Sequence, residues 1–274
     1  MRIQHNIKAL NAHRTLRTNN SREKRNVEKL ASGYRINRAA DDAAGLNISE
    51  QMRAQVTGLD QARANSLDGV SLVETMEGAM EEVHGMLNRM MELAIQSGND
   101  TYSDQNRQTM QEEIDALADE FERIEQTTKF NGISLLQGNS GVKSLTFQIA
   151  ENTEASSQLT VELADLRQVD VRGISVATAD QARESVSKIE RGIDYISKER
   201  GKVGAYFNRL EYTANNLNVM SSNISASESR IRDVNMAKEE MRRVKNDILG
   251  ESAQAMLAQA NQVPEGLLPL LQQE

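Results

Sequence analysis

Hydrophobic residues recur at helical spacing along most of the chain. Over residues 43–97 the apolar positions alternate in steps of three and four residues, which is typical of a helix that packs its seam against other helices. The seam in the second half of this segment comprises Val73, Met76, Met80, Val83, Leu87, Met90 and Ala94. No proline interrupts the segment, so the pattern predicts one long helix over residues 43–97.

Two later segments show the same alternation. Ser103 is a candidate N-cap for the first of them, and Thr178 with Gln181 three residues on forms a capping-box pattern before the other. The first seam comprises Met110, Ile114, Leu117, Phe121 and Ile124. The other comprises Val186, Ile189, Ile193, Ile196, Val203, Phe207, Leu210, Ala214, Leu217 and Ile224, with Arg200 and Ser221 as interruptions.

Between these two helical segments the period changes to two. Apolar and polar residues alternate in two short runs, which predicts two strands, most simply a hairpin. The apolar members of the runs are Leu145, Phe147 and Ile149, then Leu159, Val161 and Leu163. The stretch Phe130–Gly132 contains Asn-Gly and predicts a turn, and residues 165–177 are expected to form a connection.

Both ends of the chain carry thin apolar stripes. A helix with so narrow a stripe buries too little surface to offset its ordering entropy. We therefore expect the two terminal arms to pair with each other and to be buried further by assembly; two tails that are disordered in the free chain are the alternative. The expected assembly residues are Ile3, Ile7, Leu10, Leu30, Ile231, Val234, Ile248, Met256, Leu257, Leu267, Leu268, Leu270 and Leu271.

The segment Leu30–Glu50 joins two helical patterns and is predicted to be a hinge. Gly33 can adopt the positive φ at which a helix ends, and Asp41 and Asp42 suit the positive end of a new helix dipole. Small residues follow, so that another backbone could approach closely. The expected hinge residues are Gly33, Arg35, Asn37, Asp41, Asp42 and Gly45. Together these patterns predict a mainly α fold, an elongated antiparallel helical bundle of coiled-coil type with a small β-hairpin.

Composition narrows the class of protein. The 274 residues are 38% hydrophobic but only 3% aromatic, which favours packed helices over one thick globular core. The net charge is −8 and no dense basic block occurs, so nucleic-acid binding is not expected. No apolar run reaches the roughly 18 residues of a membrane helix, and we expect no membrane insertion and no cleavable secretory signal.

The sequence offers no pattern for catalysis or for a cofactor. Cysteine is absent, and none of the three histidines has a second histidine four residues away, so no metal site is predicted. The carboxylates lie off the seams, on faces expected to be solvated, and the glycines form no phosphate-binding loop. We expect no catalytic residues, no cofactor and no enzymatic activity.

Several stretches resemble the sequences of one family, bacterial flagellin, the subunit of the flagellar filament. The most specific is LASGYRINRAADDAAGLNISE at residues 30–50. The others are LDGVSLVETMEGAM, NRMMELAIQSGNDT, NRLEYTANNL and the segment Ala226–Leu271, in the order in which the family carries them.

The resemblance implies a structural, self-assembling subunit of an open helical polymer that serves motility. It implies that residues 1–42 and 225–274 form an inner terminal layer and that residues 43–224 form an outer layer of long helices, with the hairpin near 130–164. Large variable outer domains are missing, as in a short flagellin. Export without cleavage through a type III channel, flagellar cap and hook-junction proteins, and a C-terminal export chaperone are also implied. The location would be the extracellular flagellum or, as in spirochaetes, a periplasmic one.

The resemblance further implies recognition by the innate receptor Toll-like receptor 5. The contact motif of the family matches at residues 88–96, where Arg89 and Leu93 share a helix face and are expected to form an exposed anchor pair. The residues implied for receptor binding are Arg89, Leu93, Gln96, Met110 and Glu113. Met91 departs from the basic residue that many receptor-active members carry at that position.

Three other protein classes fit parts of the pattern. A hook–filament junction protein or another rod-like axial protein shares the helical arms, although the matches at residues 30–50 and 252–271 favour the filament subunit. A heptad-repeat signalling rod conflicts with the hairpin and with the interrupted terminal stripes. A helical-bundle enzyme is not supported, because the sequence offers no pattern of catalytic residues.

Overall fold

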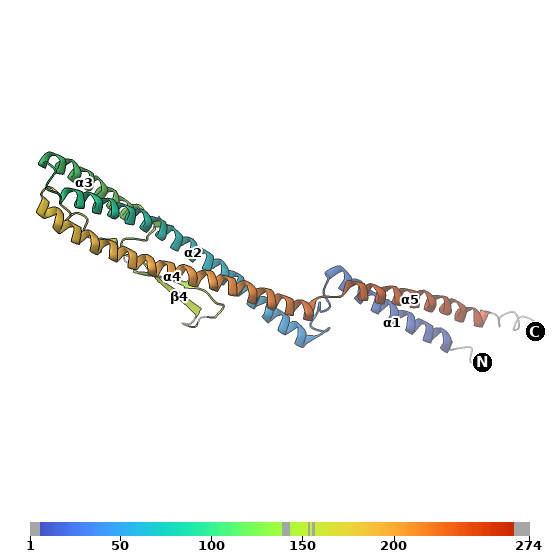
Figure 1. The fold of residues 1–274 in the computed structure, drawn as a ribbon. Coiled ribbons are helices and arrows are strands. Elements are labelled where there is room, and N and C mark those ends of the chain that lie inside the picture. Colours follow the sequence, from blue (N-terminus) through green and yellow to red (C-terminus); the bar gives the residue numbers. More distant parts are fainter. Residues whose placement is uncertain (1–5, 139–142, 153, 155–156, 266–274) are drawn as a thin grey trace, which may run out of the picture. The chain divides into compact units, whose positions relative to one another are not determined.

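The structure is a computed structural model that describes residues 6–138, 143–152, 154 and 157–265. Figure 1 shows the long helices and strand β4, and the structure contains two small antiparallel strand pairs. The helices are α1 (Ile7–Ser32), α2 (Ala43–Ser97), α3 (Asp104–Thr127), α4 (Ala179–Arg232) and α5 (Met236–Glu265), with a short 3-10 helix η2 (Leu166–Gln168). The strands are β1 (Lys129–Phe130), β2 (Ile133–Ser134), β3 (Ser144–Gln148) and β4 (Gln158–Glu162). The predicted mainly α fold with a small β-hairpin is confirmed.

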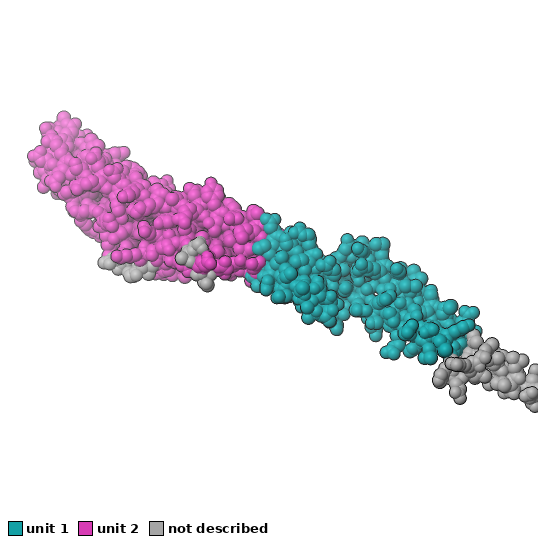
Figure 2. Space-filling view, turned by 90° about the horizontal axis from the view of Figure 1, so that it is seen from below, with its two compact units in different colours: residues 1–54, 223–274 teal, residues 55–222 magenta. Residues whose placement is uncertain are grey.

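The chain divides into two compact units (Figure 2). Unit 1 comprises residues 1–54 and 223–274, and unit 2 comprises residues 55–222. Both α2 and α4 contribute residues to each unit. The division into inner and outer layers, with boundaries at residues 42 and 225, concerns an assembled filament and stays a prediction.

The core of unit 2 is the predicted seam of α2. Met76, Met80, Val83, Leu87 and Met90 are all fully buried among side chains of α3, α4 and the β3–β4 pair. The bounds of α2 coincide with the predicted segment, and Ser103 caps α3 as predicted. The predicted capping box of α4 is only half present, because Gln181 Oε1 accepts from Ser175 Oγ at 3.4 Å and not from Thr178 N–H. Ser103 Oγ accepts from Asn106 N–H at 3.4 Å, and Thr178 Oγ1 accepts from Gln181 N–H at 3.3 Å.

The other two seams differ from prediction in detail. In α3, Ala118 is buried while Leu117 and Ile124 are only half-buried against the core. In α4, Ser221 does not interrupt the seam: it is buried and donates a 2.8 Å hydrogen bond to Asp60 of α2. Small and polar residues therefore occupy seam positions that a search for hydrophobic residues overlooks.

The predicted hairpin is present as β3 and β4. The strands are antiparallel, with Leu145 opposite Val161 and Phe147 opposite Leu159. A second pair, β1–β2, was not predicted. It closes around Asn131 and Gly132, which have φ of 48° and 81°, so the predicted Asn-Gly turn is in fact a two-residue hairpin turn.

The predicted connection at 165–177 is part of the core. Its buried residues are Leu166, Val169, Val171, Ile174 and Val176. Gln111 of α3 holds this strap, residues 166–176, by accepting from Val176 N–H at 2.6 Å and donating to the Ile174 carbonyl at 3.4 Å. The strap thereby covers the bundle, and its backbone is satisfied both by these side-chain contacts and by backbone hydrogen bonds such as that from Leu166 N–H to the Leu136 carbonyl at 3.1 Å.

Candidate functional site

The terminal helices pair in unit 1, as the sequence predicts. Figure 1 shows α1 and α5 side by side, and their Cα atoms approach within 8 Å along the pair. The pair is antiparallel, because Asn6 Nδ2 donates to the Ala260 carbonyl at one end while Asn26 lies against Glu239 at the other. Asn6 also caps α1 by accepting from Ala9 N–H at 3.1 Å.

The seam between α1 and α5 is made mostly of small and polar residues, together with Leu16, Leu30 and Leu257. The inward positions of α1 recur in steps of three and four, and those of α5 do the same. In α1 they are Ala9, Ala12, Leu16, Asn19, Glu23, Asn26 and Leu30. In α5 they are Glu239, Arg243, Asn246, Gly250, Ala253, Leu257 and Ala260. A Cβ atom on Gly250 would lie 3.8 Å from Asn20 Oδ1, so the side chain of Asn20 lies against this glycine.

The apolar stripes read from the sequence do not form this seam. Ile7 is 59% exposed and Ile248 is 57% exposed, and several neighbours are similar. The described outer apolar residues are Ile7, Leu10, Val27, Met241, Val244, Ile248, Leu249 and Met256. Of the remaining expected assembly residues, Leu30, Ile231, Val234 and Leu257 are half-buried, whereas Ile3, Leu267, Leu268, Leu270 and Leu271 lie outside the described residues. The helices pair as expected, with Leu30 and Leu257 in the seam, and burial of the exposed apolar residues by assembly stays a prediction.

A groove of about 620 Å³ runs between α1 and α5. Leu249, Met256 and Ala253 give it an apolar wall, while Asn11 and Thr15 line the α1 side. Its apolar wall is continuous with the outer apolar residues of α5. An apolar side chain from another protein could therefore pack there.

The hinge ends α1 and begins α2 as predicted. Gly33 has φ of 74° and donates its N–H to the Lys29 carbonyl at 3.0 Å. Asp42 Oδ1 accepts from Gly45 N–H at 2.9 Å, which caps α2. A Cβ on Gly45 would lie 2.5 Å from Asp42 Oδ2 and 2.9 Å from Ile36 Cδ1, so a larger residue there would force these two side chains to shift.

Asp41 fixes the loop between the two helices. Its Oδ2 accepts from Asn37 N–H and Arg38 N–H, both at 3.2 Å. Burial acts to raise the pKa of Asp41, but these two N–H groups and the charges of Lys29 and Arg38 outweigh it, so the pKa is lowered. A carboxylate that is charged in this position stabilises the loop.

The hinge loop is also tied to the junction between α4 and α5. Arg35 donates its side chain to the Ile231 carbonyl, and Val234 N–H donates to the Gly33 carbonyl at 3.0 Å. Arg232 stacks over Tyr34, 4.8 Å from the ring centre, and pairs with Glu50. The hydrogen bond from Arg232 lowers the pKa of Glu50. Sequence reasoning missed Arg232 and Tyr34, because their contacts join segments that are nearly 200 residues apart.

The residues implied for receptor binding separate into two groups. Arg89, Gln96 and Glu113 are exposed; Arg89 donates to Glu113 at 2.8 Å across α2 and α3. Leu93 is only 2% exposed and Met110 is buried as well. The expectation that Leu93 is an exposed anchor is wrong, because α3 packs along the side of α2 that carries it.

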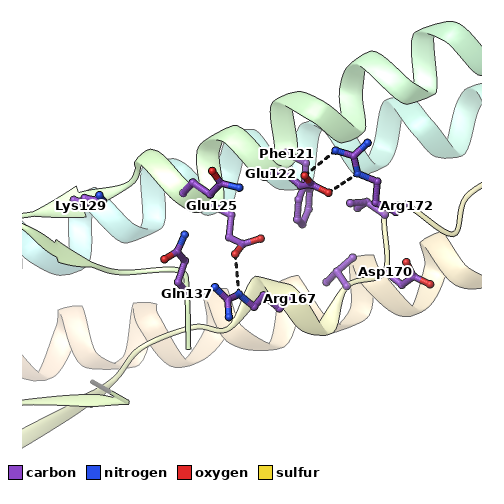
Figure 3. A pocket seen from close by; sticks show the side chains of 11 residues that line it. Phe121, Glu122, Glu125, Lys129, Gln137, Arg167, Asp170 and Arg172 are labelled. Carbon is purple, nitrogen blue, oxygen red and sulfur yellow. Dashed lines mark hydrogen bonds and ion pairs between the residues drawn. The ribbon is translucent and has the colours of Figure 1, made fainter. Parts of the chain in front are cut away.

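A polar pocket lies between α3 and the strap (Figure 3). Arg172 pairs with Glu122, with Nη2 to Oε2 at 2.8 Å, and Arg167 Nε lies 3.1 Å from Glu125 Oε1. The hydrogen bond from Arg172 lowers the pKa of Glu122. These charged side chains are engaged with each other and tie the strap to α3. Over the described residues, no cluster of His, Asp and Glu could hold a metal ion, and no helix is long and apolar enough to cross a membrane.

Comparison with known proteins identifies the family. Residues 3–141 match the bacterial flagellin N-terminal helical region, and residues 186–271 match the bacterial flagellin C-terminal helical region. The flagellin of Halalkalibacterium halodurans is 47% identical, and the flagellar filament 33 kDa core protein of Treponema phagedenis is 41% identical. Each alignment covers 99% of this chain and 100% of the relative.

The fold agrees with this assignment. The crystal structure of Bacillus cereus flagellin matches with a TM-score of 0.52 and 27% identity, over 60% of this chain and 94% of that one. Flagellins are structural proteins and not enzymes, in agreement with the prediction of no enzymatic activity. The chain therefore belongs to the bacterial flagellin family and is a structural subunit of the flagellar filament.

Proposed function

We propose that the outer apolar residues of α1 and α5 drive polymerisation by packing against neighbouring subunits. The observation that carries this proposal is their exposure in a helix pair whose own seam is small and polar. A helix normally turns its apolar side inward, so an exposed apolar side indicates a partner. Contacts of this kind between different surfaces of identical subunits do not close, and they give an open helical polymer.

The expected gain from this burial is of the same size as the cost of assembly. Burial of one Ile, Leu or Met side chain contributes about 1.5–3 kcal/mol, so the outer apolar residues together would contribute on the order of 10 kcal/mol. Ordering and association entropy oppose this gain by a comparable amount. Assembly would therefore depend on subunit concentration and on a template that pre-orders the contact.

Seeded polymerisation tests the proposal. Ile248→Asp places a charge among the outer apolar residues of α5 and should abolish elongation from seeds, measured by light scattering and electron microscopy. Gln254→Asp is the matched control, because it adds the same charge at an exposed position of the same helix. Both variants should melt like the wild type as free subunits. Normal elongation of Ile248→Asp filaments would contradict the proposal.

We propose the same surface for transient partners of the subunit. Before assembly, the exposed side chains of α5 would be covered by a C-terminal export chaperone during type III export without cleavage. At the filament ends, the cap and hook-junction proteins would present complementary helices. The filament itself would be extracellular, or periplasmic as in spirochaetes; both fit a protein of the flagellum.

We propose that Toll-like receptor 5 recognises the surface formed by Arg89, Gln96 and Glu113. Two helices contribute to this surface, and the bond from Arg89 to Glu113 presents a pre-oriented guanidinium. Leu93 and Met110 would support it from the core. Arg89→Ala should weaken binding to the receptor ectodomain about tenfold, since a central arginine commonly contributes 1–2 kcal/mol or more.

Arg123→Ala is the control for this measurement. Arg123 is an exposed arginine of α3 that pairs only with Glu120 of its own helix among the ion pairs described. Unchanged binding of Arg89→Ala to the receptor ectodomain would show that Arg89 is not part of the site. An equal loss of affinity for Arg123→Ala would show the same.

A further inference from the structure

The methionines of this chain differ sharply in exposure. Met76, Met80 and Met90 lie in the core of unit 2 and have no exposed surface. Among the described residues, the exposed methionines all lie in the C-terminal part of the chain, and they are Met220, Met236, Met241 and Met256. A reagent in solution would therefore reach the thioethers of this part while the bundle protects those of its core.

Met241 and Met256 belong to the outer apolar residues of α5. They are 67% and 62% exposed. Val244, Ile248 and Leu249 lie between them on the same side of the helix, at three, seven and eight residues from Met241. Met256 also lines the groove between α1 and α5. A chemical change at both sulfurs would therefore alter both ends of the apolar surface of α5.

Methionine is the side chain of this protein that a peroxide oxidises most readily. Cysteine and methionine are the usual targets, and this chain has no cysteine. The thioether sulfur attacks one oxygen of hydrogen peroxide, so that an S–O bond forms and the O–O bond breaks. The proton on the transferred oxygen passes to the departing hydroxide, and water leaves. The sulfur loses the two electrons that the peroxide gains, and the product is methionine sulfoxide.

The sulfoxide has opposite consequences in water and in an apolar contact. On an exposed side chain its oxygen is solvated, so the free subunit tolerates it. Between subunits the same polar oxygen would have to lose its water without gaining a hydrogen-bond partner, which is unfavourable. Oxidation of the outer methionines would therefore oppose assembly and leave the bundle intact.

We propose that Met241 and Met256 form a reversible oxidation site, through which hydrogen peroxide prevents a free subunit from joining a filament. The two sulfurs are accessible in the helix pair, and an α5 released from α1 would expose them no less. A methionine sulfoxide reductase would restore the thioether while two thiols of its reductant form a disulfide and the oxygen leaves as water. The inference rests on the proposed function, because assembly is lost only if the outer apolar residues are buried between subunits.

Peptide mass spectrometry tests the modification in the full chain. Free subunits are treated with hydrogen peroxide for increasing times and then digested. Met241 and Met256 should be converted at least about ten times faster than Met80, which reacts only when the bundle opens. Equal rates for Met80 and Met256 would overturn the inference. The melting transition of the bundle should be the same before and after this treatment.

Seeded elongation tests the consequence. Oxidised wild-type subunits should elongate at least about ten times more slowly, since burial of one methionine contributes more than the free energy of a tenfold change. Methionine sulfoxide reductases with dithiothreitol should restore the rate. The variant Met241→Leu with Met256→Leu conserves side-chain volume, so it should elongate normally both before and after peroxide treatment. Oxidised wild-type subunits that elongate normally would overturn the inference.

Met220→Leu with Met236→Leu is the matched control. It removes two exposed methionines that are not among the outer apolar residues and should stay as sensitive to peroxide as the wild type. Sensitivity that persists without Met241 and Met256, or that disappears in the control, would also overturn the inference. The assembly proposal fails separately, through normal elongation of Ile248→Asp. The peptide map does not involve polymerisation and would still identify the oxidised methionines in that case.

Discussion

The bundle of unit 2 and the helix pair of unit 1 use the same alternation of three and four residues but fill it with different side chains. In the bundle, Met76, Met80 and Leu87 point inward and are fully buried. In the terminal pair, Asn26 and Glu239 occupy the equivalent inward positions. The small residues of the pair allow its backbones to approach more closely than those of the bundle helices.

This difference gives the two regions different roles: the bundle stabilises the folded chain, and the terminal pair provides a defined alignment of its helices. The bundle buries most of its large apolar side chains within one chain, so it has the driving force to fold alone. The terminal pair has a specified alignment but leaves its apolar side chains outside, so much of its stabilisation is available only from other molecules. A filament subunit benefits from this division, because the arms remain weakly held until neighbours are present.

The largest expected effect comes from a charge in the bundle seam. Met80→Asp would bury an unpaired carboxylate at a site with no exposed surface and should destabilise unit 2 by about 4–5 kcal/mol or more, close to the whole stability of many domains. Ile95→Asp on the same helix is the control, because Ile95 is 61% exposed. Circular dichroism melting should show loss of the cooperative transition only for Met80→Asp. A cooperative transition retained in Met80→Asp would show that the assignment of Met80 to the seam is wrong.

A smaller change in the free subunit is expected when α1 is removed. Deletion of residues 1–30 should leave the bundle transition within about 0.5 kcal/mol of wild type, since that core lies within residues 55–222. The α5 helix should lose helicity, because a single amphipathic helix without its partner is marginal. Seeded polymerisation should stop. Filament growth by the truncated chain would show that the two arms are not needed as a pair.

The contrast between the units also explains what the sequence could predict. The bounds of α2, the caps at Ser103 and Thr178 and the β3–β4 hairpin follow from hydrophobic period and cap chemistry, which are local. The strap escaped prediction because Leu166, Val169 and Val171 have no regular period, and only the surrounding helices show that they are inside. The β1–β2 pair was missed because two-residue strands carry no period.

The terminal seam was missed for a different reason. The hydrophobic pattern marks Ile7, Leu10 and Ile248 as residues to be buried by pairing or by assembly, but in the pair they are exposed and the inner side is mostly small and polar. A signal did exist: Asn19 and Asn26 are seven residues apart, as are Ala253 and Ala260. That repeat reveals a close-packed seam only when the partner helix is known, since each half alone resembles a polar surface.

The smallest expected effect concerns the hinge, where a surface ion pair and not a core holds the loop. Glu50 pairs with Arg232, and its pKa is lowered in the folded protein by the hydrogen bond from Arg232. A carboxyl group whose pKa is lower in the folded protein stabilises the fold at pH values above its unfolded pKa, which is about 4.5 for Glu. This stabilisation is lost as the pH falls through the pKa of the folded state. The protection factor of the Val234 amide, the ratio of its intrinsic to its observed exchange rate at the same pH, should therefore be high at pH 6 and should fall below about pH 4.

Glu50→Gln should remove part of this pH dependence, while Glu251→Gln, at an exposed position of α5, should retain all of it. The lowered pKa of Asp41 acts with the same sign, so Glu50→Gln leaves a residual dependence that Asp41→Asn removes. Glu50 is exposed, and the effect on global unfolding should be too small to move the bundle transition. A Val234 protection factor that is the same at both pH values in the wild type would show that the loop is held by its backbone bonds to Gly33 and not by charge.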